Sequence, residues 1–267
     1  MPKFPLYWID AFTDKPFHGN PAGVVPLAAW PEAALMQKIA FENGLAETAF
    51  FVRTGPDRFH LRWFTPELEM DLCGHATLAS AFVVFSHLGQ TGDRIVFDSR
   101  SGPLTVTRRP DGRLELDFPS RPPSPVPEAQ LPPTLLPGLR GPHPLWIGKA
   151  RDYICVYAAG ADVLALKPDF TLLNQIDVIG IIATAPGTDG TDFVSRFFAP
   201  NCGVPEDPVT GSSHCTLVPY WAEKIGRKQL RARQISARGG DLLCEIAGDR
   251  VKMAGHAVLY LRGEIMI

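Results

Sequence analysis

An internal repeat constrains this sequence more than any other feature. Residues 62–66 read Arg-Trp-Phe-Thr-Pro, and residues 196–200 read Arg-Phe-Phe-Ala-Pro. Farther along the chain, a shift of 137 residues (211 − 74 = 137) places Gly74 on Gly211. The same shift aligns two more pairs, Gly102 with Gly239 and Arg113 with Arg250. Because three widely spaced matches share one register, the sequence predicts a duplicated half.

The two copies differ most in the segment that leads to Gly211. The shift between the arginines at positions 62 and 196 is 134 residues (196 − 62 = 134), so the second copy contains three extra residues (137 − 134 = 3), which lie between Asn201 and Asp207. Gly74 and Gly211 precede predicted helices, and we expect them to be functional. The other matched glycines are expected to be turn residues only.

Two small halves are expected to pack against each other, because neither can bury much apolar surface alone. Such packing leaves a cleft at the junction, which is a common place for a ligand site. The segment from residue 119 to residue 144 holds ten of the 26 prolines, which is typical of a connector. We therefore expect two domains, residues 1–120 and residues 121–267, with the last strand able to return to the first half.

The composition is that of an ordinary folded chain, with 45% hydrophobic and 20% charged residues among 267. A net charge of −2 without a dense cluster of Lys and Arg argues against a nucleic-acid partner, and no apolar run approaches the roughly 18 residues of a membrane span. The first residues lack the apolar core of a signal peptide, which predicts a cytoplasmic protein. Five scattered cysteines predict reduced thiols rather than a zinc site or disulfides: Cys73, Cys155, Cys202, Cys215 and Cys244.

Each half is predicted to contain one nearly uncharged helix among many short strands. The helix over His75–Leu88 is too apolar to lie on a surface, and the helix over Ser212–Ile225 is expected to be enclosed in the same way. A further helix is expected over Pro31–Ala40. The pattern predicts an α+β fold of two pseudo-symmetric domains, each a curved, barrel-like β-sheet around a central helix. The expected strands include Glu47–Arg53, Phe59–Phe64, Val178–Ala183, Asp192–Phe198 and Gln234–Ala237.

The two helix starts suit the binding of an anion. The first turn of a helix presents unpaired backbone N–H groups and a partial positive charge. Gly74 and Gly211 let a ligand approach the backbone, and Ser212 follows directly. If the halves face each other, both helix starts point into one cleft and hold a single carboxylate without arginine or metal. The alternative is that Thr77, Ser212 and Ser213 only cap the helices.

Three side chains near these turns are candidates for proton transfer. Glu47 lies in an apolar predicted strand, where loss of solvation raises the pKa of a carboxylate toward the range of a general base. His75 could donate a hydrogen bond or exchange a proton, and Asp207 could orient a ligand group or His75. The alternatives are a Glu47 that points to water, a structural His75 and an Asp207 that stabilises its own turn. The 134-residue shift puts Ile181 at the place of Glu47 in the second half, so only one half supplies this carboxylate.

At these residues the sequence resembles the PhzF-like family, named for the phenazine-biosynthesis isomerase, within the diaminopimelate epimerase-like superfamily. The resemblance covers nearly the whole chain, and the last two of its segments together are highly specific. It implies two pseudo-symmetric domains with the active site between them, a homodimer and no cofactor. The segments are Asp10-Ala11-Phe12, Gly19-Asn20-Pro21-Ala22, Glu47-Thr48-Ala49-Phe50, Phe64-Thr65-Pro66, Gly74-His75-Ala76-Thr77 and Glu206-Asp207-Pro208-Val209-Thr210-Gly211-Ser212.

The resemblance also implies roles for individual residues. In the family's phenazine enzyme, the residue that matches Glu47 moves a proton across an allylic system, assisted by the matches to His75, Asp207 and Ser212. Backbone donors at the helix starts would hold the substrate. Asn20 matches a position that lies near the substrate in related epimerases. The substrate-binding positions implied in this way are Asn20, Gly74, Gly211 and Ser212.

The sequence also departs from the pattern of its relatives. Racemases and epimerases of the superfamily use two opposed cysteines, one at each helix start. Cys73 occupies the first position, but Asp207–Gly211 contains no cysteine for the second. Family members often have Ser before the matched Glu, where this chain has Ala46. A two-thiol racemase is therefore disfavoured, and Glu47 is preferred as the main proton carrier.

The leading hypothesis is an isomerase that needs neither cofactor nor metal and moves a proton on a small carboxylic acid. Glu47 is the acid and base, His75 and Asp207 assist, and the helix starts hold the carboxylate. A second hypothesis is an epimerase or racemase with Cys73 as one base. A third is a non-catalytic protein that binds a small acid, because a fold alone never proves activity.

Overall fold

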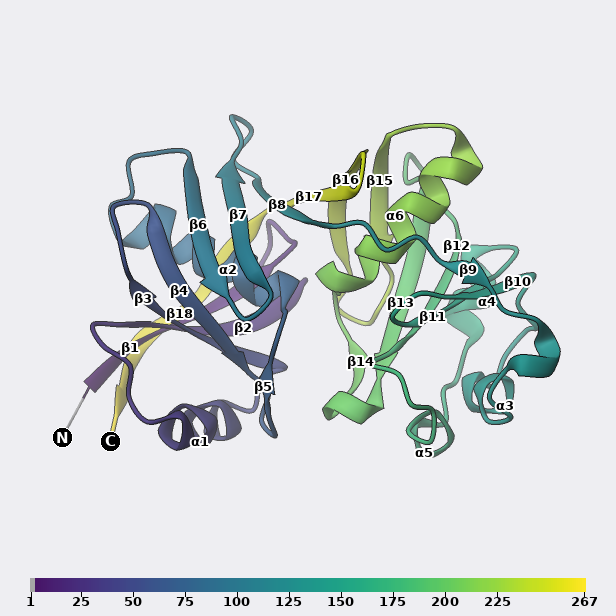
Figure 1. Cartoon of the computed structure of the whole chain (residues 1–267), viewed down its shortest axis with the longest axis horizontal. Helices are drawn as coiled ribbons and strands as arrows, with labels where there is room; N and C mark the ends of the chain where they lie inside the picture. The colour runs from purple at the N-terminus through teal and green to yellow at the C-terminus, as the bar shows by residue number, and fades with distance from the viewer. Residues whose placement is uncertain (1–2) are drawn as a thin grey trace. The chain divides into compact units, whose positions relative to one another are not determined.

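The computed structural model describes residues 3–267 (Figure 1). The chain forms two compact units. The first unit runs to Phe118 and also includes Lys252–Ile267, whereas the second unit is Pro119–Val251. Both units combine a curved sheet with a few helices, so the predicted α+β class is confirmed.

The strands of the first unit pair in the order β18-β1-β2-β3-β4-β6-β7-β8-β17. The short β5 pairs with Trp63 and Phe64 of β4, beyond the residues of β4 that pair with β6. The pairs β2–β3 and β4–β6 are parallel, whereas the other pairs for which the register is known are antiparallel. The bounds are β1 Lys3–Ala11, β2 Asn20–Leu27, β3 Glu47–Arg53, β4 Arg58–Phe64, β5 Glu69–Met70, β6 Arg94–Ser99, β7 Gly102–Arg108, β8 Leu114–Pro119, β17 Arg250–Gly255 and β18 Ala257–Met266.

The helix α2 (Gly74–His87) forms the centre of the first unit. Nearly all of its side chains are buried, because it carries Ala, Val, Leu and Phe on every side. It packs against β1, β2, β3 and β18. The helix α1 (Ala33–Asn43) buries Met36, Ile39 and Ala40 against the sheet and ends at Gly44, whose left-handed φ of 63° suits glycine.

The second unit repeats this plan. Its strands pair in the order β9-β10-β11-β12-β13-β15-β16, with β11–β12 and β13–β15 parallel, and β14 pairs with β13. The bounds are β9 Ser124–Pro125, β10 Trp146–Lys149, β11 Tyr153–Val156, β12 Ile181–Pro186, β13 Phe193–Ala199, β14 Val204–Asp207, β15 Gln229–Gln234 and β16 Gly240–Ala247. The alternation of parallel and antiparallel pairs matches that of β2 to β7, as a duplicated half predicts.

The long helix of the second unit is α6 (Gly211–Ile225), and its buried residues pack against β15 and β16. Four shorter helical segments and one 3-10 turn at the insertion lie around the sheet. They are η1 Glu128–Gln130, α3 Leu135–Leu139, α4 Gly160–Ala165, α5 Phe170–Leu173 and η2 Pro200–Cys202. Apolar side chains of α3, α4 and α5 join a core that contains Tyr153, Cys155, Tyr157 and Phe198.

Several expectations at the level of elements were confirmed and two were wrong. Both long helices lie within one or two residues of their predicted bounds, and both turn glycines, Gly102 and Gly239, have positive φ. The strand predicted at Gln234–Ala237 was wrong, because β15 ends at Gln234. The prediction missed β15 because this strand alternates buried Leu230 and Ala232 with exposed polar residues, so its sequence does not look apolar. The strand predicted at Val178–Ala183 begins three residues later.

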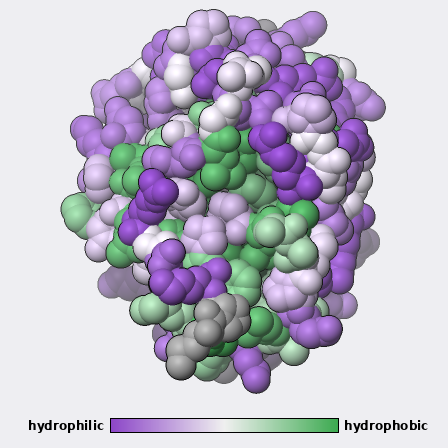
Figure 2. Space-filling view, turned by 90° about the vertical axis from the view of Figure 1, so that its left-hand side faces the viewer, coloured by the Kyte–Doolittle hydropathy of each residue, from purple (hydrophilic) through white to green (hydrophobic). Residues whose placement is uncertain are grey.

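Figure 2 shows hydrophobic side chains gathered near the middle of the face that looks out from the left of Figure 1. The strand β18 carries Tyr260 and Leu261, which are exposed, and Tyr260 contacts the rings of Trp8 and Phe17. Within residues 3–267, none of the helices has the length and apolar character needed to cross a membrane.

Candidate active site

Glu47 and His75 form a buried acidic and basic pair in the first unit. Glu47 is the first residue of β3, and His75 is the second residue of α2. Glu47 Oε2 lies 3.2 Å from His75 Nε2, with 13% and 3% of the two side chains exposed. The contact is not aligned as a hydrogen bond, so both of these buried atoms keep a hydrogen-bonding position open. The alternative of a Glu47 that points to water does not fit this geometry.

The other ring nitrogen of His75 faces two residues. Asn20, the first residue of β2, places Nδ2 3.0 Å from His75 Nδ1. Its side-chain amide can serve either state of the ring, because its nitrogen donates to neutral imidazole and its oxygen accepts from imidazolium. The Sγ atom of Cys73 lies 3.6 Å from the same Nδ1. The structure therefore places Glu47 and Asn20 at opposite nitrogens of the His75 ring.

The electrostatics of this pair favour a charged histidine. Burial lowers the pKa of His75, but the negative charge of Cys73 when it is ionised and the negative charge of the Glu47 carboxylate outweigh burial, and the pKa of His75 lies well above its usual value. Burial raises the pKa of the Cys73 thiol to about 11, and the Glu47 carboxylate acts in the same direction. Cys73 is thus a protonated thiol at neutral pH, which does not suit it as a base.

The same three residues are the candidate metal ligands. Glu47, Cys73 and His75 each offer a ligand atom, and these atoms lie within 4.8 Å of one another. A metal would need the thiolate, and the raised pKa of Cys73 makes its proton hard to displace. The donor set therefore suits proton transfer better than the binding of a metal ion.

The starts of the two long helices are free of side-chain caps. Neither the N-cap Cys73 of α2 nor the N-cap Thr210 of α6 accepts a backbone N–H with its side chain. Thr77 and Ser213 do not cap either, because their hydroxyls donate to the carbonyls of Cys73 (2.5 Å) and Thr210 (2.8 Å). The capping alternative is wrong for these two residues, and the first-turn N–H groups at Gly74 and Gly211 suit an anion.

Asp207 ends β14 and is mostly buried, with 9% exposed. Its Oδ2 accepts a hydrogen bond of 2.5 Å from Thr210 Oγ1. Gln234 closes the turn, because its Nε2 donates to the Asp207 carbonyl (2.5 Å) and its Oε1 accepts from the Thr210 N–H (2.9 Å). Asp207 thus stabilises its own turn, as one alternative predicted. Gln234 was missed, because a lone Gln at the end of a strand gives no sequence signal.

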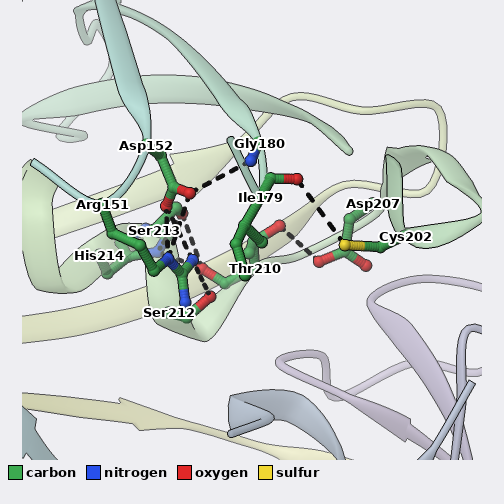
Figure 3. Close-up of polar contacts among 10 residues, drawn as sticks. All are labelled: Arg151, Asp152, Ile179, Gly180, Cys202, Asp207, Thr210, Ser212, Ser213 and His214. Atoms are coloured by element: carbon green, nitrogen blue, oxygen red, sulfur yellow. Dashed lines mark hydrogen bonds and ion pairs between the residues drawn. The ribbon is translucent and has the colours of Figure 1, made fainter. Parts of the chain in front are cut away.

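Ser212 meets an arginine that the sequence analysis also missed. Figure 3 shows Arg151 lying between Asp152 and Ser212, and its Nη2 donates to Ser212 Oγ at 3.0 Å. An arginine therefore lies beside the start of α6, and the expectation that the helix starts hold a carboxylate without arginine stays a prediction. Arg151 lies in the turn before β11, 61 residues from Ser212 in sequence, so no local pattern could reveal this contact.

The buried His214 in α6 is not a candidate for proton exchange. Its Nδ1 lies 2.8 Å from the Thr210 carbonyl, which fixes the proton on that nitrogen. Burial lowers the pKa of His214 to about 4, so the ring is neutral near pH 7. The role of His214 is structural.

One expected correspondence was wrong by one residue. Ile181 pairs with Phe198 in the second unit, whereas Thr48 pairs with the matching Phe64 in the first unit. The counterpart of Glu47 is therefore Gly180, not Ile181. A side chain at Gly180 would overlap the buried ring of Phe197, so the second unit has no room for a carboxylate there.

The comparisons with known proteins now decide the family. The family model described as phenazine biosynthesis-like protein matches residues 9–263. The chain belongs to this PhzC-PhzF family. A Pseudomonas aeruginosa protein named as an uncharacterized isomerase is 49% identical, and the alignment covers 98% of each chain.

Solved structures agree with this assignment. The crystal structure of a PhzF-family protein from Enterococcus faecalis has a TM-score of 0.93 and 43% identity, and the match covers 100% of both chains. A hydroxyproline epimerase from Agrobacterium vitis has a TM-score of 0.64 at 9% identity, covering 98% of this chain and 92% of that one. The second likeness concerns the fold alone, which is the epimerase-like fold that the sequence predicted.

Proposed function

We propose that this protein is an isomerase that moves a proton on a small carboxylic acid, without a bound cofactor or metal. The observation that carries the proposal is the buried contact of Glu47 with His75 at the uncapped start of α2. An acid/base carboxylate beside backbone donors is what abstraction of a proton next to a carboxylate requires. The name of the P. aeruginosa relative supports the class of reaction.

Glu47 is the proposed proton carrier. Its Oε2 is buried and has an open hydrogen-bonding position, so it can accept a proton from a substrate carbon and return it elsewhere. His75, held by Asn20 on its far side, fixes the carboxylate and balances its charge. Because His75 is already paired with Glu47, its proposed role is to position and polarise rather than to carry the proton.

The proposed anion contacts are the first-turn N–H groups of the long helices, at Gly74 in α2 and at Gly211 in α6, together with the Ser212 hydroxyl. Asp207 is proposed to shape the turn before Gly211, which supports its role as an assisting residue. Asn20 is proposed to act through His75 and at the edge of the substrate site. That both helix starts hold one substrate stays a prediction.

A decisive test follows the incorporation of solvent deuterium into cyclic or unsaturated carboxylic acids. Glu47→Gln should lower the rate of exchange by at least about 100-fold, because general acid and base catalysis contributes that much. Exposed Glu42→Gln in α1 is the matched control and should exchange at the wild-type rate. Equal exchange by Glu47→Gln and wild type would remove Glu47 from its role.

The epimerase hypothesis, with Cys73 as a base, is the second candidate. The position of Cys73 at the start of α2 favours it, but burial holds the pKa of the thiol at about 11. Thr210, the residue before Gly211, occupies the place of the opposed cysteine. We therefore prefer the single-carboxylate isomerase.

We also propose that the protein is a homodimer, as the family resemblance implies, and that it is cytoplasmic, as the composition and the first residues led us to expect. The exposed side chains of Phe17, Tyr260, Leu261 and Met266 support a protein contact on the first unit, because large exposed apolar groups often mark an interface. A second copy of the chain is the proposed partner, besides the small carboxylate substrate.

A further inference from the structure

We propose that Arg151 is a positioning residue that makes the Ser212 hydroxyl a hydrogen-bond donor to an anionic ligand at the start of α6. This inference deepens the proposed function, on which it rests. Arg151 is not expected to contact the ligand itself. It acts through Ser212, and both residues belong to the second unit.

The Arg151 guanidinium is held in one place by Asp152. Arg151 Nε lies 3.1 Å from both carboxylate oxygens of Asp152, and Nη2 lies 2.7 Å from Oδ2. Asp152 is only 1% exposed, and its Oδ1 also accepts the Gly180 N–H at 3.2 Å. A carboxylate fixed by a backbone group in turn fixes the guanidinium fork, so Nη2 has a defined direction toward Ser212.

The chemistry of the two groups decides which atom donates. A guanidinium has only N–H donors, so Ser212 Oγ must accept the 3.0 Å hydrogen bond from Arg151. The single O–H of Ser212 is then directed away from Arg151 and toward another acceptor. Ser213 differs, because its hydroxyl donates to the Thr210 carbonyl. Ser212 alone of these two serines keeps its proton for a ligand.

The first unit contains an analogous contact. The shift of 137 residues places His75 on Ser212 (212 − 75 = 137), and each of these first-turn residues is held by a polar side chain that lies at the start of a strand or in the turn just before one. Asn20 holds His75, and Arg151 holds Ser212. The duplicated fold thus keeps the positioning contact while the chemical groups differ. A cation suits a residue that binds an anion, which supports the role of Arg151.

A thiol at position 212 tests the inference without any ligand. The thiolate absorbance of Ser212→Cys is followed against pH as the difference from wild type. It should give a pKa for the new thiol below the usual cysteine pKa of about 8.5. Adding Arg151→Gln with Asp152→Asn removes both charges, so no buried carboxylate is left unpaired. In that background the thiol should become about tenfold less acidic. An unchanged titration would overturn the inference.

Binding of benzoate, followed by calorimetry, tests the role toward an anion. Arg151→Lys keeps the charge beside Asp152 but loses the fork, and should weaken binding about tenfold. In a Ser212→Ala background the same change should weaken binding less than about threefold, because the two act as one unit. Arg62→Lys, which alters another half-buried arginine paired with a carboxylate, is the control and should bind as wild type.

Two results of this cycle contradict the inference. Equal weakening by Arg151→Lys with and without Ser212 would mean that Arg151 contacts the ligand directly or supports only the fold. No weakening in either background would mean that it has no role toward the anion. If benzoate does not bind to the wild-type protein, the thiol titration alone decides. Neither measurement depends on Glu47, so a failure here is distinct from a failure of the deuterium exchange test.

Discussion

At the scale of single residues, burial and neighbours decide the chemistry more than residue type does. Cys73 and His75 lie two positions apart, yet the surroundings that keep the thiol protonated favour the charged ring. His75 and His214 are both buried at the start of a long helix, but only His75 has a carboxylate beside it. The pKa of His75 is therefore raised and that of His214 is lowered.

The protonated state of Cys73 leads to a first prediction. Cys73→Ser should lower the rate of deuterium exchange by less than about fivefold, because the thiol makes only a contact of 3.6 Å with His75 and is not the proton carrier. Exchange kinetics with the acid that serves for Glu47→Gln provide the measurement. Complete loss of exchange would favour the epimerase hypothesis instead.

The lowered pKa of His214 predicts sensitivity to acid. The pKa of His214 is about 6.5 in the unfolded chain and about 4 in the folded chain. The contribution of the neutral ring to the free energy of unfolding is therefore fully present above pH 6.5 and is lost as the pH falls toward 4. Between pH 6.5 and 5 the loss should be on the order of 2 kcal/mol. His214→Gln should show a smaller loss in urea unfolding, whereas exposed His18→Gln should behave as wild type. An identical loss in His214→Gln would contradict the assignment.

The raised pKa of His75 changes stability with pH in the direction opposite to that of His214. Because its folded pKa lies above the ordinary value of 6.5, its contribution to the free energy of unfolding is fully present below 6.5 and is lost as the pH rises through the folded pKa. His75→Asn should remove this part of the pH dependence in urea unfolding between pH 6.5 and 9. A wild-type slope in the variant over this range would contradict the raised pKa of His75.

At the scale of elements, the repeat keeps its scaffold and changes its functional positions. Arg62 makes a two-pronged ion pair with Glu69 at 2.7 and 2.8 Å, and Arg196 makes the same pair with Glu206. The partners are seven residues apart in the first copy and ten in the second, so the three inserted residues lie inside this loop. The longer loop of the second copy contains η2, and the ion pair is kept across it.

The missing carboxylate of the second unit gives an element-scale prediction. At Gly180, the residue before β12, a methyl group would overlap the ring of Phe197, which is only 3% exposed and cannot move aside. Gly180→Ala should therefore cost about 1 to 3 kcal/mol of stability. Gly55→Ala, whose added methyl group meets only an ordinary contact with Arg58, should cost much less. Chemical unfolding of both variants measures the difference, and equal stability would contradict the proposed crowding.

At the scale of the whole molecule, the chain returns to its first unit after completing the second. The strands β17 and β18 carry Lys252–Ile267 into the sheet of the first unit, where β18 pairs with β1 along its length. In β18, the side chains of Tyr260 and Leu261 are exposed. This arrangement makes the first unit depend on both ends of the chain.

The proposed homodimer can be tested on the same strand. Replacing Tyr260 and Leu261 together with Lys should convert a dimer to a monomer, because two charges would be buried without partners. Leu145→Lys, at an exposed leucine of the second unit, is the control and should leave the mass unchanged. Light scattering after size-exclusion chromatography gives the mass, and a double variant that stays dimeric would place the interface elsewhere.

The sequence by itself determined the duplicated plan, the two apolar helices, the α+β class and the family, because repeats and hydrophobic patterns are local properties that residues carry wherever they lie. Only the tertiary structure decided that Glu47 meets His75, that Asn20 and Arg151 hold the first-turn residues of the long helices, and that Gly180 takes the place of Glu47 in the second unit. These contacts join residues 28, 55 and 61 positions apart or follow from strand register, and such distances are set by how the sheets pair and pack rather than by any pattern along the chain.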